Sequence, residues 1–181
     1  MNKAISNPNA TTYLIIIMGV SGCGKSTLAQ ALAKHYGYSY LDADDFHSEE
    51  ARALMAQGIP LTDDNRAPWI GALKQHLENN NIINEHSILA FSGLKQKHRN
   101  ELRKAGLRTI VLFLQGKQDI IQQRIDKRLG HFMAPQLLTS QFESLEVPVD
   151  EVDVYPIEIN TSIEKVTDKA IEIIDRVLLN R

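Results

Sequence analysis

A glycine-rich stretch near the start of the chain constrains its fold more than any other feature. The segment 19–27, GVSGCGKST, follows the continuous apolar run Tyr13–Met18, which is typical of a strand buried on both faces. Apolar residues then recur at helical spacing over Lys25–Tyr36, and Gly37 follows as a stop signal. A buried strand, a tight turn and a helix in this order predict the first unit of a parallel α/β sheet.

The same stretch meets the requirements of a phosphate-binding loop, because it fits the pattern G-x-x-x-x-G-K-[ST] at every position. Glycines let the backbone turn so that successive N–H groups point at one phosphate, and the helix N-terminus adds partial positive charge. Lys25 is expected to reach the β- and γ-phosphates of ATP, and the Ser26 hydroxyl to ligate Mg²⁺. The predicted nucleotide-binding residues are Gly19, Val20, Ser21, Gly22, Cys23, Gly24, Lys25, Ser26 and Thr27.

The rest of the chain continues the alternation of strands and helices. Further strands are predicted at 38–42, 87–91, 109–114 and 154–159, and further helices at 48–57, 64–78, 96–104, 117–129 and 163–178. We therefore predict a five-stranded parallel sheet with helices on both faces. With 181 residues and 43% hydrophobic content, the chain suits one domain. That domain is expected over residues 13–181, after a flexible tail at 1–12.

Composition excludes several classes of partner. The formal net charge is −2, whereas nucleic-acid and membrane-surface proteins favour basic patches. Cys23 is the only cysteine, so no internal disulfide can form, and within the loop we expect it to be a small filler. The polar start has no apolar core of a signal peptide, and no apolar run approaches membrane-spanning length. We expect a soluble cytoplasmic protein.

The positions of the Asp residues that follow the strands distinguish this chain from other classes of phosphate-loop protein. The Asn-Lys-x-Asp motif of switch GTPases is absent, and two later strands run into Ser92 and Gln115 where motor-type ATPases usually carry a metal-binding Asp. Asp42 and Asp44 instead follow the second strand, and on an extended segment this spacing would aim both to one side. We expect Asp42 near Mg²⁺ and Asp44 as acceptor of a proton from an attacking hydroxyl. The alternative is that Asp44 or Asp45 caps a helix.

Basic side chains gather where a substrate would lie. Arg66 stands near the start of a predicted helix, and Lys95 and Arg99 follow the third strand, so an anionic substrate would find positive partners there. Arg66 could instead pair only with Asp63 or Asp64, and Lys95 could be merely solvated.

A second basic group precedes a predicted movable flap. Arg124 and Arg128 are four residues apart and share a helix face, and Gly130 allows a hinge. Cations on a flap that closes over transferring phosphates would neutralise charge and exclude water. We expect a helical lid at about 128–146, with an exposed basic helix face as the alternative.

Five segments of the chain together resemble the gluconate kinases, small phosphate-loop enzymes related to shikimate and adenylate kinases. They are GVSGCGKST, LDADDFH, GIPLTDDNRAPW, SGLKQKHRNELR and GHFMAPQLLTSQFESLEVP. The resemblance implies ATP-dependent phosphorylation of D-gluconate at its 6-hydroxyl, with Mg²⁺, in an enzyme type that is commonly homodimeric. It implies that Arg124 and Arg128 bind the nucleotide, and that Lys25, Asp44 and Arg128 act in catalysis. On the substrate side the resemblance implies Asp44, Arg66 and His131, and Ser92, Lys95 and Arg99 are further substrate candidates because they follow the third strand.

Two other functions remain open from the sequence. One is a kinase for another small hydroxy acid, such as shikimate. The other is a regulatory protein that senses ATP without transferring phosphate, although such a protein would not need the Asp42 and Asp44 carboxylates or the flap arginines. ADP release measured over a panel of sugar acids would separate the three.

Overall fold

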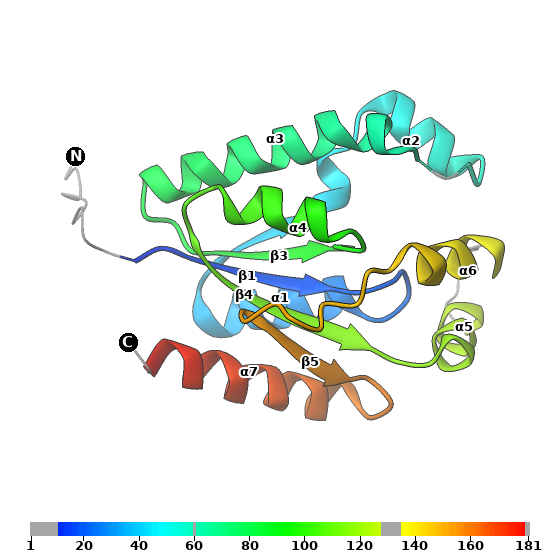
Figure 1. The fold of residues 1–181 in the computed structure, drawn as a ribbon. Helices are drawn as coiled ribbons and strands as arrows, with labels where there is room; N and C mark the ends of the chain where they lie inside the picture. Colours follow the sequence, from blue (N-terminus) through cyan, green and yellow to red (C-terminus); the bar gives the residue numbers. More distant parts are fainter. Residues whose placement is uncertain (1–10, 60, 128–134, 180–181) are drawn as a thin grey trace.

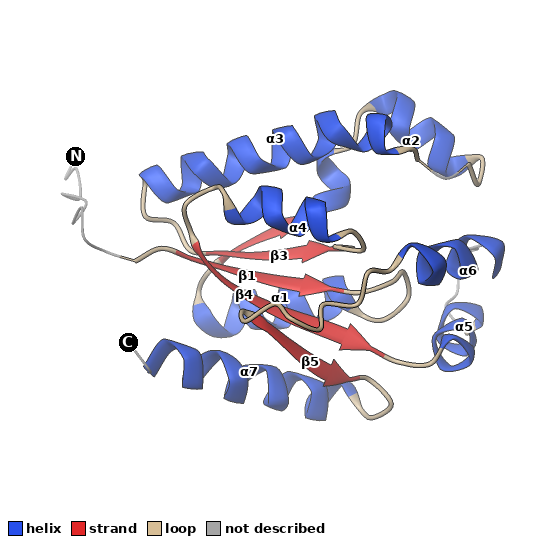
Figure 2. Cartoon of the chain, viewed as in Figure 1, coloured by secondary structure: helices blue, strands red, loops and turns tan. Residues whose placement is uncertain are grey.

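The computed structural model describes residues 11–59, 61–127 and 135–179, and they form a three-layer α/β structure (Figure 2). The strands are β1 Tyr13–Met18, β2 Ser39–Asp42, β3 Ser87–Phe91, β4 Arg108–Gln115 and β5 Val154–Glu158. All neighbours pair in parallel, in the order β2-β3-β1-β4-β5. The predicted five-stranded parallel sheet is thereby confirmed.

The helices follow the predicted alternation closely. They are α1 Lys25–Tyr36, α2 Glu49–Ala56, α3 Asp63–Ile82, α4 Gln96–Arg103, α5 Gln118–Asp126, α6 Pro135–Ser144 and α7 Ile163–Leu179. Helix α3 starts where Thr62 and Asn65 form a reciprocal capping box, and it extends one turn beyond the predicted end at Glu78. Within the described ranges, no helix combines the length and apolar character needed to cross a membrane.

Strand β1 contributes side chains to the apolar core on both faces of the sheet and so fixes where the following loop begins. Ile15 and Ile17 face one cluster, formed with α1 and α7, whereas Ile16 and Met18 face the other, formed with α3 and α4. Figure 1 shows these helix pairs on opposite faces of the sheet, with α2, α5 and α6 toward the carboxyl ends of the strands. Since β1 lies between β3 and β4, the loop after it sits at the switch point where ligands of such sheets bind.

Only the second part of the predicted lid belongs to the described residues, and it is helix α6. Leu138 of α6 is fully buried in the same apolar cluster as Ile121 and Ile125 of α5. This part of the segment therefore packs on the core in the structure.

Candidate active site

The loop between β1 and α1 has a backbone that only glycine accommodates. Gly19 and Gly22 have φ angles of 146° and 80°, in the region that side chains rarely adopt. A Cβ on Gly19 would lie 2.7 Å from the carbonyl oxygen of Leu114, and one on Gly22 would lie 2.5 Å from the Ile125 side chain. The loop is thus wedged between the end of β4 and helix α5.

The loop presents backbone donors that the protein itself does not use. Within the part of the chain that the structure describes, the amides of Gly22, Gly24, Ser26 and Thr27 find no protein acceptor. Unused amides at a helix N-terminus form an anion-binding cradle. The Lys25 ammonium donates to the carbonyl of Val20 in the same loop at 3.0 Å, and its contact with phosphate stays a prediction.

Asp42 joins the loop to the second strand. The Ser26 hydroxyl donates to Asp42 Oδ2 at 3.0 Å, and the Tyr40 hydroxyl donates to the same oxygen at 2.9 Å. Burial, and then the hydrogen bond and charge of Asp42, raise the pKa of Tyr40. The structure thus brings the two predicted metal residues together. It also adds Tyr40, which the two-residue period of a strand could have placed on the same side as Asp42.

The predicted extended geometry between Asp42 and Asp44 is wrong. The strand ends at Asp42, and residues Ala43–Phe46 form a 3₁₀ turn whose first donor, the Asp44 amide, is capped by Asp42 Oδ1 at 3.1 Å. The Asp44 side chain is 85% exposed and lies 3.9 Å from His47 Nε2. Asp42 therefore supplies the helix cap that had been considered for Asp44 or Asp45, and the Asp44 carboxylate remains open to a ligand.

Trp69 fixes the 3₁₀ turn to the sheet. Its indole N–H donates to the carbonyl of Ala43 at 2.6 Å, and its ring stacks on His47 with centroids 4.2 Å apart. Phe91 at the end of β3 lies against it at 5.4 Å. Burial lowers the pKa of His47, so this imidazole is neutral near pH 7 and the carboxylate of Asp44 gains no cation from it.

The predicted substrate cations are held by weak, partly exposed ion pairs. Arg66 lies 3.7 Å from Asp63, the alternative foreseen for it, and Lys95 lies 3.4 Å from Glu146. Pairs of this kind contribute little stability in water, so both cations can exchange these partners for an anionic ligand. Ser92 follows β3 and accepts from the Gly19 amide at 3.2 Å through its carbonyl.

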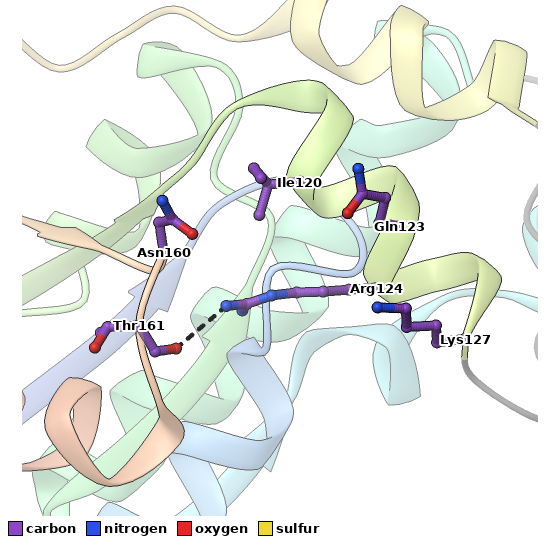
Figure 3. Close-up of a pocket in the computed structure, with 6 residues that line it drawn as sticks. All are labelled: Ile120, Gln123, Arg124, Lys127, Asn160 and Thr161. Carbon is purple, nitrogen blue, oxygen red and sulfur yellow. Dashed lines mark hydrogen bonds between the residues drawn. The ribbon is translucent and has the colours of Figure 1, made fainter.

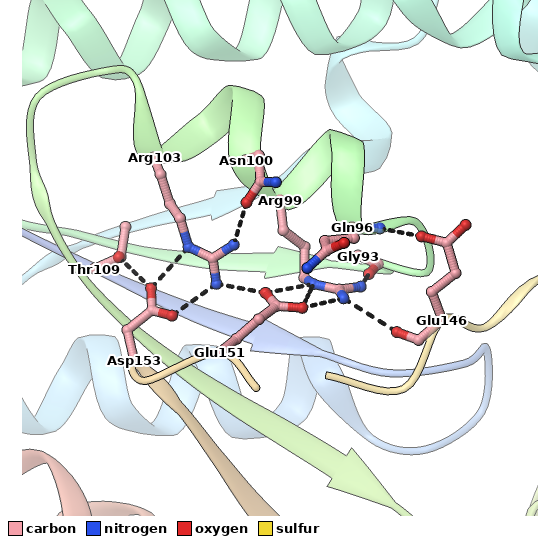
Figure 4. A network of polar contacts seen from close by, with 9 residues as sticks. All are labelled: Gly93, Gln96, Arg99, Asn100, Arg103, Thr109, Glu146, Glu151 and Asp153. Carbon is pink, nitrogen blue, oxygen red and sulfur yellow. Dashed lines mark hydrogen bonds and ion pairs between the residues drawn. The ribbon is translucent and has the colours of Figure 1, made fainter. Parts of the chain in front are cut away.

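Arg99 does not lie where a substrate ligand must lie. Its side chain is 1% exposed and forms an ion pair with Glu151, and it donates to the carbonyls of Gly93 and Glu146 at 2.5 and 3.1 Å. Figure 4 shows it enclosed in a network that continues to Arg103 and Asp153. The guanidinium is occupied by protein acceptors, so we correct the predicted role of Arg99 from ligand to structural anchor.

A cavity of about 320 Å³ lies beside α5 and is lined by Ile120, Gln123, Arg124, Lys127, Asn160 and Thr161 (Figure 3). The Arg124 guanidinium donates to the carbonyls of Ile159 and Thr161, which fixes its plane along one wall. Helix α5, which lines this cavity, also contacts the phosphate loop, because Ile125 abuts Gly22. The predicted residues Arg128 and His131 lie outside the described residues.

Comparisons with known proteins agree with this geometry. The model of the AAA domain family matches residues 14–146. A probable gluconokinase of Mus musculus is 37% identical over 88% of this chain and 96% of its own, and the thermoresistant gluconokinase of Escherichia coli K12 is 36% identical over 95% and 99%. A solved gluconokinase of Sinorhizobium meliloti 1021 superposes with a TM-score of 0.85 at 33% identity, covering 94% of each chain. The chain belongs to the gluconokinase family.

Proposed function

We propose that this protein transfers the γ-phosphoryl group of ATP to the 6-hydroxyl of D-gluconate. The observation that carries the proposal is the juxtaposition of a phosphate loop, the Ser26–Asp42 pair and the exposed carboxylate of Asp44 at one edge of the sheet. The gluconokinases to which the chain is similar supply the choice of substrate. They also favour gluconate over shikimate, and phosphoryl transfer over ATP sensing.

The nucleotide would bind with its phosphates on the unused amides of the loop and on Lys25. The cavity at Arg124 is lined by α5, the helix that also contacts the loop through Ile125, so it is the proposed place for the base. The described residues contain no cluster of three carboxylate, His or Cys side chains able to hold a metal alone. Mg²⁺ would therefore be held by the Ser26 hydroxyl, Asp42 and phosphate oxygens, and it would neutralise charge that develops during transfer.

Gluconate would lie between the 3₁₀ turn, the start of α3 and the turn after β3. Arg66 and Lys95 are the cations within reach of its carboxylate, and Asp44 would receive the proton of the attacking hydroxyl. From the family resemblance we retain Arg128 as a cation for the transferring phosphoryl group and His131 as a substrate residue. The function of the 128–146 segment as a lid stays a prediction, and α6 within it packs on the core in this structure.

The proposal is tested by coupled ADP release with gluconate, shikimate and other small hydroxy acids as acceptors. We expect turnover with gluconate to exceed turnover with every other acid, and the product to be 6-phosphogluconate by mass and NMR analysis. A preference for shikimate would select the alternative kinase. ATP binding with no transfer to any acid would select the sensing protein.

Asp44→Asn is expected to lower turnover about 10²-fold, in the range of general-base loss. The amide keeps the size of the side chain and one acceptor oxygen but removes the base and its charge. ATP affinity measured by calorimetry should change little. Asp45→Asn is the matched control, because Asp45 is an exposed carboxylate in the same 3₁₀ turn. Near-parental turnover of Asp44→Asn at saturating gluconate would contradict the assignment.

Asp42→Asn is expected to raise the Mg²⁺ concentration that gives half-maximal activity. The substitution replaces a charged acceptor of the Ser26 hydroxyl with a neutral one and so weakens the oxygen donor set that Mg²⁺ prefers. Titration of activity with Mg²⁺ at fixed ATP and gluconate measures the effect. An unchanged Mg²⁺ requirement would place the metal elsewhere.

A further inference from the structure

One amide of the phosphate loop is not free but is bound by a side chain from a distant part of the chain. Ser21 N–H donates to the carboxamide oxygen Oε1 of Gln141 at 2.7 Å, across 120 residues of sequence. Gln141 belongs to α6 and is half-buried.

The contact is built into the packing of α6 on the loop. Phe142 and Leu145 pack against the apolar cluster that contains Val20 of the loop, and all three line a second cavity of about 280 Å³. Leu138, one turn before Gln141, is fully buried in the core. Buried neighbours on the same helix face fix where α6 lies, so the carboxamide is held against the loop by more than its own hydrogen bond.

Within the described ranges, two anchors outside the loop hold its first half, and Gln141 is one of them. Gly19 N–H is fixed by the carbonyl of Ser92 at 3.2 Å, and Ser21 N–H is fixed by Gln141. Among the described residues, the amides of Gly22, Gly24, Ser26 and Thr27 have no protein acceptor and follow Ser21, whereas the unpaired Val20 amide lies between the two anchored ones. A neutral carboxamide suits the anchoring position, because a carboxylate there would repel phosphate.

We propose that Gln141 is a positioning residue for nucleotide binding: it holds the Ser21 amide and so keeps the following amides of the loop arranged for the phosphates of ATP. The proposal rests on the proposed ATP-binding role of the loop. It adds a residue outside the loop that contributes to the affinity for the nucleotide. Preorganised donors bind an anion without the cost of ordering a glycine-rich loop.

Gln141→Met tests the proposal, because Met has a similar length and packs but offers no comparable acceptor. We expect the affinity for the non-hydrolysable ATP analogue AMP-PNP, measured by calorimetry, to fall about 5- to 10-fold, as loss of one net hydrogen bond predicts. The KM for ATP should rise by a similar factor, whereas the KM for gluconate should stay within twofold. If Gln141 only stabilised the fold, its substitution would not raise the KM for ATP while leaving the KM for gluconate unchanged.

Gln118→Met is the matched control. Gln118 Nε2 donates to Thr139 Oγ1 at 2.8 Å, so this variant also loses one hydrogen bond to α6, but away from the loop. Both variants should lower the unfolding midpoint by similar amounts, and only Gln141→Met should lose affinity for AMP-PNP. Unchanged or tighter binding by Gln141→Met, or an equal loss in Gln118→Met, would overturn the proposal. A parent protein that does not bind AMP-PNP would instead overturn the proposed function itself.

Discussion

Lys25→Ala is expected to lower turnover by about 10²–10³-fold, which corresponds to roughly 3–4 kcal/mol of lost transition-state stabilisation. The ammonium is the only side-chain cation on the described phosphate loop, and its contact with the Val20 carbonyl holds it over the free amides. Negative charge on the phosphates would then meet this cation in a site partly screened from water. Steady-state turnover with saturating ATP and gluconate measures the effect.

The control for Lys25 is Lys34→Ala, an exposed lysine on the same helix α1. It should keep parental turnover, and both variants should keep the parental unfolding midpoint, because neither side chain belongs to the core. Turnover of Lys25→Ala within about threefold of the parent would show that the ammonium does not act on the transferring phosphate.

Most of the fold could be predicted from local patterns, because its elements have clear ends. Helix α1 has the predicted bounds, since the loop glycines precede it and Gly37 closes it with a φ of 67°. The strand order could not be predicted, because each strand is an apolar run that fits several neighbours. The 3₁₀ turn was also missed. Asp42 satisfies its first amide, and a cap of this kind is hard to distinguish from a catalytic carboxylate in sequence.

The candidate site also has one part that could be predicted from the sequence and one part that could not. The phosphate loop and the Ser26–Asp42 pair follow from a motif with fixed spacing, and the structure brings these residues together. Gln141 and Arg99 act through partners 120 and 52 residues away, and no local spacing reports such distances. Arg99 also shows that positive charge alone does not predict a ligand contact, because a basic residue near a site can form ion pairs within the protein instead.

Arg99→Met is expected to destabilise the protein by about 3–5 kcal/mol, the range measured when one partner of a buried ion pair is removed. Of the cations that pair with the 7% exposed Glu151 carboxylate in the described part of the chain, the substitution leaves Arg103. It also leaves the carbonyls of Gly93 and Glu146 without the donor they share. Urea unfolding at pH 7 measures the loss. Lys104→Met is the control, because Lys104 directly follows the same helix and forms an exposed ion pair with Glu101, and little change is expected.

The pH dependence of the stability lost in Arg99→Met distinguishes the contribution of the Arg99–Glu151 ion pair from that of packing. Burial raises the pKa of Glu151, but the hydrogen bonds and charges of Arg99 and Arg103 outweigh burial and hold that pKa below its usual value. A lowered folded-state pKa contributes stability that is fully present above the unfolded pKa, about 4.3, and is lost as the pH falls through the folded value. The difference in stability between the parent and Arg99→Met should therefore shrink below about pH 4. A difference that stays constant from pH 7 down to pH 3 would mean that Arg99 stabilises the fold through its packing and its neutral acceptors rather than through Glu151.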